Sequence, residues 1–330
     1  MNTPIPANPP ISPYSDAIVA NFVPHGSSPW NQYFIGPRDR DPVAYPSSAT
    51  PKVTVQVNFP SCANHVVSVA IPASTQLTPP NNENYLVVML PNGDQWDFWN
   101  LTKPGEAPYN SGDWGGSGGC TANGDWQAIE AIRHRPGWNG LGTFTGGGSE
   151  SGLFEAYGAI RLLDTQRTRA GGTWGHAINW TGFDNCAGGN ASGLPRFVPP
   201  ATEGNGANSN AGCFPMGSRW QLDPSINCNT WPSMVGKPEW MKQMCRTLQV
   251  YGMIDAHSTF GQGDGDGFRV EYSANFPAGR RYPWQDPKTG AWPDPYSPSL
   301  NLPPDLLSHF RVIDWTKWTG APKHRAGASR

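Results

Sequence analysis

Residues 85–101, Tyr85-Leu-Val-Val-Met-Leu-Pro-Asn-Gly-Asp-Gln-Trp-Asp-Phe-Trp-Asn-Leu101, contain the pattern that decides the fold. An apolar run over 85–90 and an alternating run over 95–101 flank the step Pro91-Asn-Gly-Asp94. Asn-Gly readily adopts the positive φ angles that a tight hairpin turn requires. The stretch therefore predicts two β-strands joined as a hairpin.

Short alternating runs separated by turn residues recur along the chain, which is typical of an antiparallel sheet. Further strands are predicted over 53–58, 66–71, 156–162, 173–180, 218–222, 253–259, 268–272 and 310–315. We therefore expect an all-β fold, an antiparallel β-sandwich or jelly roll. It should form a single β-rich domain over residues 1–330, with long loops rich in Trp, Gly and Pro.

One or two short helices interrupt this pattern. Residues 238–250 carry apolar side chains spaced by three or four, which predicts a helix. A shorter helix is predicted over 126–133. Residues 102–150 read as irregular, and residues 1–50 and 284–330 read as irregular extensions packed on the domain.

The composition narrows the class of protein. The 330 residues include 39 Gly, 35 Pro and 15 Trp, and the formal net charge is −2. Such a chain lacks the basic surface that nucleic acid or an anionic membrane would need. No apolar run is long enough to span a membrane. The first twenty residues do not resemble a signal peptide, so we expect either a leader already removed or an added Met1.

Six cysteines, none in a C-x-x-C pair, argue against a zinc ribbon or a thioredoxin-type site. The scarcity of Lys and the abundance of Asn, Gly and Trp favour an oxidising, extracellular setting. We predict that neighbouring cysteines pair, as Cys62–Cys120, Cys186–Cys213 and Cys228–Cys245. Other connectivities and free thiols remain open.

Many of the tryptophans lie beside Gly, Asn, Asp or Pro, and the set as a whole favours a saccharide surface. Sugars present apolar C–H faces ringed by hydroxyls, which suit aromatic platforms flanked by short polar side chains. In the run 95–100, alternation puts Asp97 with Gln95 and Trp99, away from Trp96 and Phe98. Desolvation beside Trp99 would keep Asp97 protonated as a general acid. A solvent-facing Asp97 on an edge strand is the alternative.

The run 173–180 predicts a strand face that carries Trp174, His176 and Trp180. If this face lines a cleft, His176 would act as base, proton shuttle or hydroxyl donor, with the two indoles binding substrate. A histidine satisfied within the core is the competing interpretation.

Two further strands carry aligned polar side chains. Arg219 and Gln221 share one face, which suits either a ligand contact or a buried network. Asp255 and His257 are two residues apart and would orient one another or share a cation, or else form a solvated face. Tyr251 precedes this strand as a further candidate substrate contact.

The loops add weaker candidates. Glu150 lies in a glycine-rich loop that lacks the features of a phosphate loop. The run 261–267 would bind a structural calcium ion through Asp264 and Asp266, although it lacks the glutamate of an EF-hand. No cofactor is required by any motif. Gly-x-Ser-x-Gly and His-Glu-x-x-His are absent, which argues against an esterase and a zinc protease.

Several segments together resemble a largely uncharacterised family of secreted proteins of actinobacteria and other soil bacteria. They are 2–7, 94–99 (DQWDFW), 158–161, 175–178 (GHAI), 198–202 (containing PPAT), 215–219 (PMGSR) and 248–254 (LQVYGMI). The resemblance implies a β-rich, exported single domain with an acidic residue at Asp97 and histidine at His176. It also implies Asp where this chain has His257, and it supplies no activity.

These features lead us to expect an extracellular glycoside hydrolase acting on a polysaccharide, as a monomer. Asp97 would be one catalytic carboxylate and Asp255 or Glu150 the second, with His176 and Arg219 orienting substrate. The alternative chemistry is a polysaccharide lyase, in which Arg219 neutralises a uronate and His176 or Tyr251 moves the proton. A non-catalytic carbohydrate-binding or adhesion protein is the third hypothesis.

Overall fold

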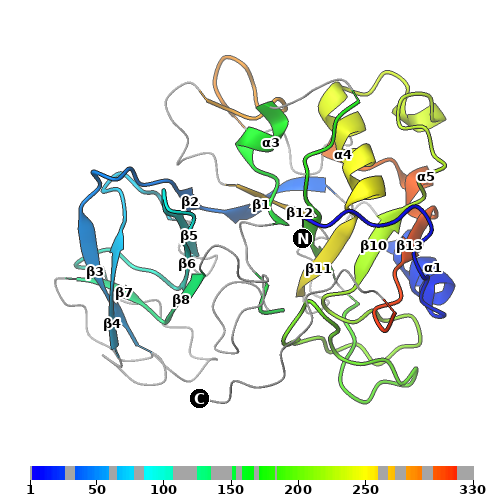
Figure 1. Ribbon diagram of the computed structural model, residues 1–330, viewed down its shortest axis with the longest axis horizontal. Helices are drawn as coiled ribbons and strands as arrows, with labels where there is room; N and C mark the ends of the chain where they lie inside the picture. The colour runs from blue at the N-terminus through cyan, green and yellow to red at the C-terminus, as the bar shows by residue number, and fades with distance from the viewer. Residues whose placement is uncertain are drawn as a thin grey trace.

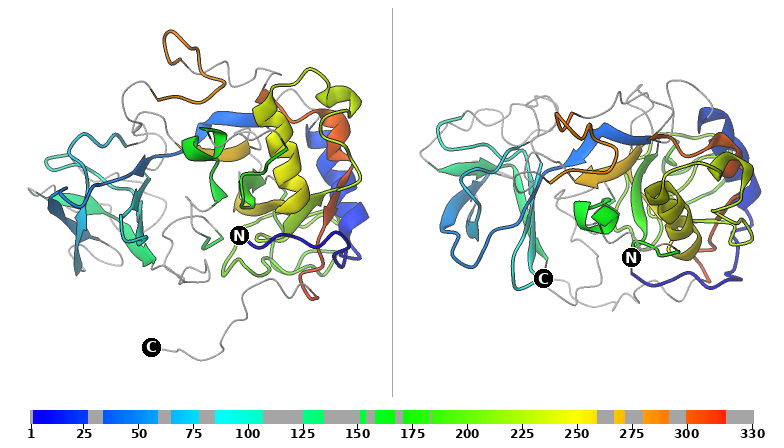
Figure 2. Two further views of the ribbon diagram at one scale, coloured as in Figure 1. Left: turned by 45° about the horizontal axis from the view of Figure 1, so that its top comes forward. Right: turned by 90° about the horizontal axis from the view of Figure 1, so that it is seen from above.

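The computed structural model describes residues 2–26, 34–58, 65–77, 85–106, 125–134, 151–153, 158–166, 171–182, 184–258, 267–271, 280–291 and 300–317. Their strands form one six-stranded, one four-stranded and one three-stranded sheet. Figure 1 shows the two smaller sheets side by side at the left, and the six-stranded sheet with most of the helices at the right. We call these groups the small lobe and the large lobe. Figure 2 shows the same separation from two other directions.

The large lobe is built on a mixed sheet of order β1-β12-β9-β11-β10-β13. Its strands are β1 (Phe34–Asp41), β9 (Ile178–Gly182), β10 (Arg219–Leu222), β11 (Met253–Ser258), β12 (Gly267–Glu271) and β13 (Phe310–Val312). The pairs β1–β12 and β11–β9 are parallel, whereas the pairs of β12 with β9 and of β10 with β11 and β13 are antiparallel.

The small lobe contains the predicted hairpin. Its four-stranded sheet consists of β2 (Val43–Ala44), β5 (Leu86–Met89), β6 (Gln95–Trp99) and β8 (Glu130–His134), and its three-stranded sheet of β3 (Lys52–Val57), β4 (His65–Ala70) and β7 (Trp126–Ala128). β5 and β6 pair antiparallel, and Gly93 adopts the positive φ of 85° that the turn needs. Leu86, Val88 and Phe98 pack in one core with side chains of the three-stranded sheet.

Helices cover the large sheet. They are α1 (Ser15–Gly26), α3 (Leu162–Gln166), α4 (Glu239–Val250) and α5 (Pro304–Leu307), with a 3-10 turn, η1 (Pro232–Met234). The predicted helix over 238–250 is confirmed as α4, with Pro238 as its N-cap. α4 buries the apolar stripe predicted from the sequence and ends at Val250; its C-cap Tyr251 is followed by Gly252, whose φ is 72°. Within the described residues, every helix is too short or too polar to cross a bilayer.

The centre of the large lobe is a set of aromatic rings in contact, which we call the aromatic core: Phe22, Trp180, Phe214, Trp220 and Phe310. The Trp180 and Trp220 ring centroids lie 5.5 Å apart in an edge-to-face arrangement. Such contacts add to the apolar area that each ring buries, so these indoles stabilise the fold.

The prediction of a β-rich fold with few short helices is confirmed, but the expectation of purely antiparallel sheets is wrong. Alternation along one strand says which side chains share a face and carries no information on the direction of the neighbouring strand. β12 is buried at every position, as strands covered on both faces are.

Several element predictions are also wrong. Residues 126–133 form β7 and β8 instead of a helix, because a short apolar run does not distinguish the two structures. Leu162, expected at the end of a strand, begins α3. Segments read as irregular contain α1, β1 and β2 before residue 50, and α5 after residue 284, whereas the strand predicted over 310–315 is present as β13. Long-range pairing and packing decide these elements, which local patterns do not report.

Two predicted disulfides are confirmed. Cys186 bonds to Cys213, and Cys228 bonds to Cys245 on α4. The proposed Cys62–Cys120 pair lies outside the described residues.

Candidate functional site

A group of ionisable side chains, most of them buried, lies where the two lobes meet. We call it the ionic cluster; its members are Tyr45, Arg161, Asp164, His176 and Glu271. They come from the residue after β2, the start of α3, the loop before β9 and the last position of β12. Because β2 belongs to the small lobe and β12 to the large lobe, the ionic cluster joins the lobes (Figure 1).

Backbone hydrogen bonds bring the start of α3 to the end of β12. The Ile160 N–H donates to the Arg269 carbonyl at 2.8 Å, and the Glu271 N–H donates to the Ile160 carbonyl at 3.1 Å. The Tyr282 hydroxyl also donates to the Ile160 carbonyl, at 2.7 Å. These bonds fix the carboxyl group of Glu271 beside the first turn of α3.

Asp164 is the most heavily bonded member. Its Oδ2 accepts hydrogen bonds from the Arg161 backbone N–H at 2.8 Å, from Arg161 Nε at 3.1 Å and from His176 Nε2 at 3.1 Å. Its Oδ1 accepts one from Arg161 Nη2 at 3.1 Å. Burial alone would raise the pKa of Asp164, but the hydrogen bonds and charges of His176 and Arg161 outweigh burial and lower it. Asp164 is therefore held as a carboxylate.

His176 uses both of its ring nitrogens. Nε2 faces Asp164, and Nδ1 lies 2.8 Å from the Ala177 carbonyl oxygen. A ring with a proton on each nitrogen satisfies both oxygen acceptors. The side chain is 3% exposed, so this geometry orients Asp164 and leaves neither nitrogen free.

The pKa of Glu271 is shifted in the opposite direction to that of Asp164. Burial raises its pKa to about 7, although hydrogen bonds from the Leu162 N–H and the Tyr45 hydroxyl favour the charged form. The Leu162 N–H donates to Oε2 at 3.0 Å. The charge of Asp164 adds to the rise. Two carboxyl groups that influence one another thus have pKa values shifted in opposite directions.

The ionic cluster has an exposed side. Tyr45 is 46% exposed and the Arg161 side chain is 29% exposed, whereas Glu271 is 2% exposed. Burial and the nearby Glu271 raise the pKa of Tyr45, and burial raises that of Tyr282. Both phenols therefore stay protonated at neutral pH. Tyr45 and Arg161 therefore form the solvent-facing side of the ionic cluster, and Glu271 lies on its buried side.

Asp97 lies elsewhere, on β6 of the small lobe. The predicted division of faces is confirmed, because Gln95 Nε2 donates to Asp97 Oδ1 while Trp96 and Phe98 pack toward the core. Asp97 is 1% exposed, so the alternative of a solvent-facing carboxylate is wrong. Trp99 beside it is half-buried.

Asp255 is held at a third place, on β11. Its side chain is fully buried and accepts a hydrogen bond from Asn185 Nδ2. His257 is 5% exposed, and a register shift between Asp255 and His257 interrupts the regular strand between them. The solvated face that we weighed for this pair is wrong. The structure thus does not gather Asp97, Asp255 and His176, which are held by different partners.

The predicted aromatic face around His176 does not form. Gly175 adopts a positive φ of 85°, and the strand begins only at Ile178, so the alternation fails over 174–177. Trp174 and Trp180 are 7% and 1% exposed and belong to the core of the large lobe. Their assignment to a wet saccharide surface is wrong.

Arg219 and Gln221 bind backbone and side-chain groups of the protein. Arg219 Nε and Nη2 donate to the Tyr251 carbonyl, at 2.9 and 2.6 Å, and Nη2 also donates to the Thr3 carbonyl at 2.8 Å. Burial lowers the pKa of Arg219 to about 10. Gln221 Oε1 accepts from Arg311 Nη2 at 2.7 Å. The buried-network alternative therefore fits this pair better than a ligand contact.

Glu150, Asp264 and Asp266 lie outside the described residues, so the second loop carboxylate and the calcium ion stay predictions. In the part of the chain that the structure describes, no three His, Cys, Asp or Glu side chains form a group suited to a metal ion.

Sequence reasoning missed Tyr45, Arg161, Asp164 and Glu271. Arg161 and Asp164 have the i, i+3 spacing of a helical ion pair, which was the available local signal. Glu271 and Arg269 are charged residues in a strand that is buried at every position, where a charge suggests a special environment.

Comparison of the chain with protein-family models, curated proteins and solved structures finds no match.

Proposed function

We propose that the protein is a glycoside hydrolase acting on a polysaccharide, with Glu271 as the proton donor and Asp164 as the ionised carboxylate. The observation that carries the proposal is the opposite shift of two interacting carboxyl pKa values. Glycoside hydrolysis needs one carboxylic acid and one carboxylate near the same bond. The exposed Tyr45 ring on the solvent-facing side of the ionic cluster, beside Arg161, supports a saccharide ligand.

The ionic cluster suggests a role for each side chain. Glu271, with a pKa of about 7, would protonate the leaving glycosidic oxygen. Asp164 Oδ1, which accepts a single hydrogen bond, would stabilise the developing positive charge on the sugar or activate water. His176 and Arg161 are positioning residues for Asp164, and Tyr45 positions Glu271. Substrate that covers Tyr45 and Arg161 would exclude water from Glu271.

The lyase alternative fits less well. His176 has both nitrogens engaged, the donors of Arg219 are directed to backbone carbonyls, and the pKa values of Tyr45 and Tyr282 are raised. None of these groups is suited to act as the base that β-elimination requires. In a non-catalytic carbohydrate-binding or adhesion protein, the opposite pKa shifts of Asp164 and Glu271 would serve no function.

We also propose that the protein is exported and acts as a monomer, with a β-sandwich in the small lobe. The disulfides Cys186–Cys213 and Cys228–Cys245 support an oxidising compartment. The core shared by the four-stranded and three-stranded sheets supports the sandwich.

The test is a screen of the purified chain against plant, fungal and bacterial polysaccharides, with reducing ends and product masses measured. We expect Glu271→Gln to lower turnover roughly a hundredfold or more. The matched control is Asp97→Asn, which alters another buried carboxylate and should retain turnover. Products that absorb in the ultraviolet would indicate elimination. Unchanged turnover in Glu271→Gln, or loss in Asp97→Asn alone, would contradict our assignment, and saccharide binding without cleavage would favour a binding protein.

A further inference from the structure

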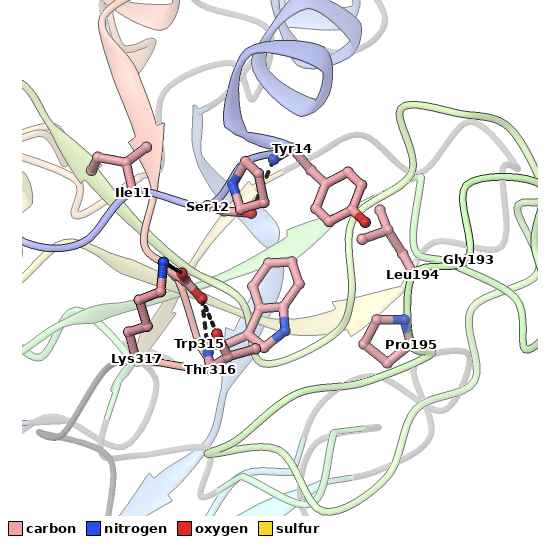
Figure 3. A pocket seen from close by; sticks show the side chains of 11 residues that line it. Ile11, Ser12, Tyr14, Gly193, Leu194, Pro195, Trp315, Thr316 and Lys317 are labelled. Atoms are coloured by element: carbon pink, nitrogen blue, oxygen red, sulfur yellow. Dashed lines mark hydrogen bonds and ion pairs between the residues drawn. The ribbon is translucent and has the colours of Figure 1, made fainter.

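A pocket lies on the large lobe, beside the β13 edge of its sheet, whereas the ionic cluster lies at the end of β12, near the opposite edge. Its volume is about 370 Å³, and three separate chain segments line it, 11–14, 193–195 and 314–317. Pockets of ~300–1,000 Å³ are the usual size for small ligands. Figure 3 shows these segments around the opening. We call it the β13 pocket.

Two aromatic side chains border the β13 pocket. The Trp315 indole packs partly against the large-lobe core, so its position is supported from behind. Tyr14 comes from the segment before α1 and is 41% exposed. In Figure 3 the Tyr14 ring and the Trp315 indole lie on different sides of the hollow, with Pro195 nearby. A flat, apolar ligand face can therefore contact the indole.

Hydrogen-bonding groups surround these rings. Asp314 is 4% exposed and accepts hydrogen bonds from the Thr316 N–H at 3.0 Å and the Thr316 hydroxyl at 2.6 Å. Lys317 Nζ lies 3.2 Å from Asp314 Oδ2, and its side chain is 70% exposed. Among the described residues, neither the Tyr14 hydroxyl nor the Trp315 indole N–H has a hydrogen-bond partner. The pocket thus offers donors to a ligand.

We infer that the β13 pocket is a second saccharide-binding site, distinct from the ionic cluster. The C–H face of a pyranose ring would stack on Trp315, and its hydroxyls would bond to Tyr14, Lys317 and the indole N–H. The choice of a glycan rests on the proposed function. Such a site would hold a polysaccharide chain while the ionic cluster acts on another part of it.

The experiment titrates the full-length ¹⁵N-labelled protein with cellohexaose, xylohexaose, mannohexaose and chitohexaose, and with decaproline. We expect at least one hexasaccharide to move the Trp315 indole N–H signal, which Trp315→Phe identifies by its loss. Trp315→Ala should weaken that binding roughly tenfold. Tyr14→Phe, which removes only an exposed hydroxyl, should weaken it by a smaller factor and keeps the test valid if Trp315→Ala does not fold.

The matched control is Trp231→Ala. Trp231 is also half-buried on the large lobe, but its indole N–H already donates to Asp305 at 2.8 Å. This variant should bind as the wild type does. Absence of any hexasaccharide response, equal binding by Trp315→Ala, or a response to decaproline alone would overturn the inference. The titration measures saccharide binding and not turnover. Its result at the β13 pocket can therefore be distinguished from the effect of Glu271→Gln on hydrolysis.

Discussion

The structure contains two largely buried regions of opposite chemistry, the aromatic core of the large lobe and the ionic cluster where the lobes meet. The aromatic core around Trp180 joins uncharged rings, and its stability comes from apolar area and ring contacts. The ionic cluster around Asp164 buries charges that depend on one another. The comparison teaches that burial by itself does not make a proton donor. Burial, together with the charge of Asp164, raises the pKa of Glu271 to about 7, whereas the hydrogen bonds and charges of His176 and Arg161 outweigh burial at Asp164.

The largest expected effect tests the aromatic side of this comparison. Trp180→Ala removes a ring that is 1% exposed and contacts Phe22, Phe214 and Trp220. We expect the free energy of unfolding to fall by about 4 to 5 kcal/mol, because the cavity cannot collapse among rigid rings. Urea unfolding at pH 6 and pH 8.5 should give the same loss. A loss that differs between the two pH values would show that the two regions are not independent.

Asp164→Asn tests the charged side. The change leaves Arg161 and His176 facing an uncharged amide, which should lower the free energy of unfolding by about 3 to 4 kcal/mol at pH 7. Because the pKa of Asp164 is lowered, its contribution is present above the ordinary aspartate pKa and is lost as pH falls through the folded value. The matched control is Asp94→Asn, which removes the partner of the more exposed Arg133. Equal losses in the two variants would contradict a special role for the ionic cluster.

The pH dependence of stability distinguishes the regions further. Glu271 has its pKa raised from 4.5 to about 7, so the folded protein holds a proton that the unfolded chain has released between these values. Stability should therefore fall by roughly 3 kcal/mol as pH rises across that window, and level off above it. Glu271→Gln should remove this slope and exceed the wild type in stability above pH 7. If the urea midpoints of the wild type and of Glu271→Gln change with pH in the same way between pH 4.5 and 8.5, the pKa of Glu271 is not raised.

The smallest effect concerns Tyr45→Phe. Loss of the hydroxyl removes a hydrogen bond that favours charged Glu271, so the pKa of Glu271 should rise further. Above pH 7 we expect a stability loss of about 1 kcal/mol, less than is usual for a bond to a charged group because Tyr45 is 46% exposed. The pH profile of turnover should move upward with it. An unchanged profile would mean that Tyr45 does not act on Glu271.

Local patterns were informative where neighbouring residues decide the structure. The apolar run over 85–90, the Asn-Gly turn and the alternation around Asp97 predicted β5, β6 and the faces of β6, because all three signals lie within one short segment, 85–101. The apolar spacing over 238–250 likewise predicted α4 and its buried stripe. Pairing each cysteine with its neighbour was sufficient for Cys186–Cys213 and Cys228–Cys245.

The candidate site could not be found in this way. Tyr45, Arg161, His176 and Glu271 are brought together by strand pairing across more than two hundred residues, and no local spacing reports it. His176 was singled out from the alternation with Trp174 and Trp180, but its ring bonds to Asp164 and to the Ala177 carbonyl. The abundance of tryptophan was misleading at Trp174 and Trp180, because a composition does not distinguish rings that bind a ligand from rings that fill a core.

β1 continues into β2 through a single residue, Pro42, although the two strands belong to different sheets. One end of this ribbon is paired with the strand that carries Glu271, and the other leads directly to Tyr45. Any rotation of one sheet against the other would therefore change the distance between the Tyr45 hydroxyl and the Glu271 carboxyl. If the angle between the two sheets changes the proton affinity of Glu271, then protonation of Glu271 must shift the preferred angle by the same coupling free energy.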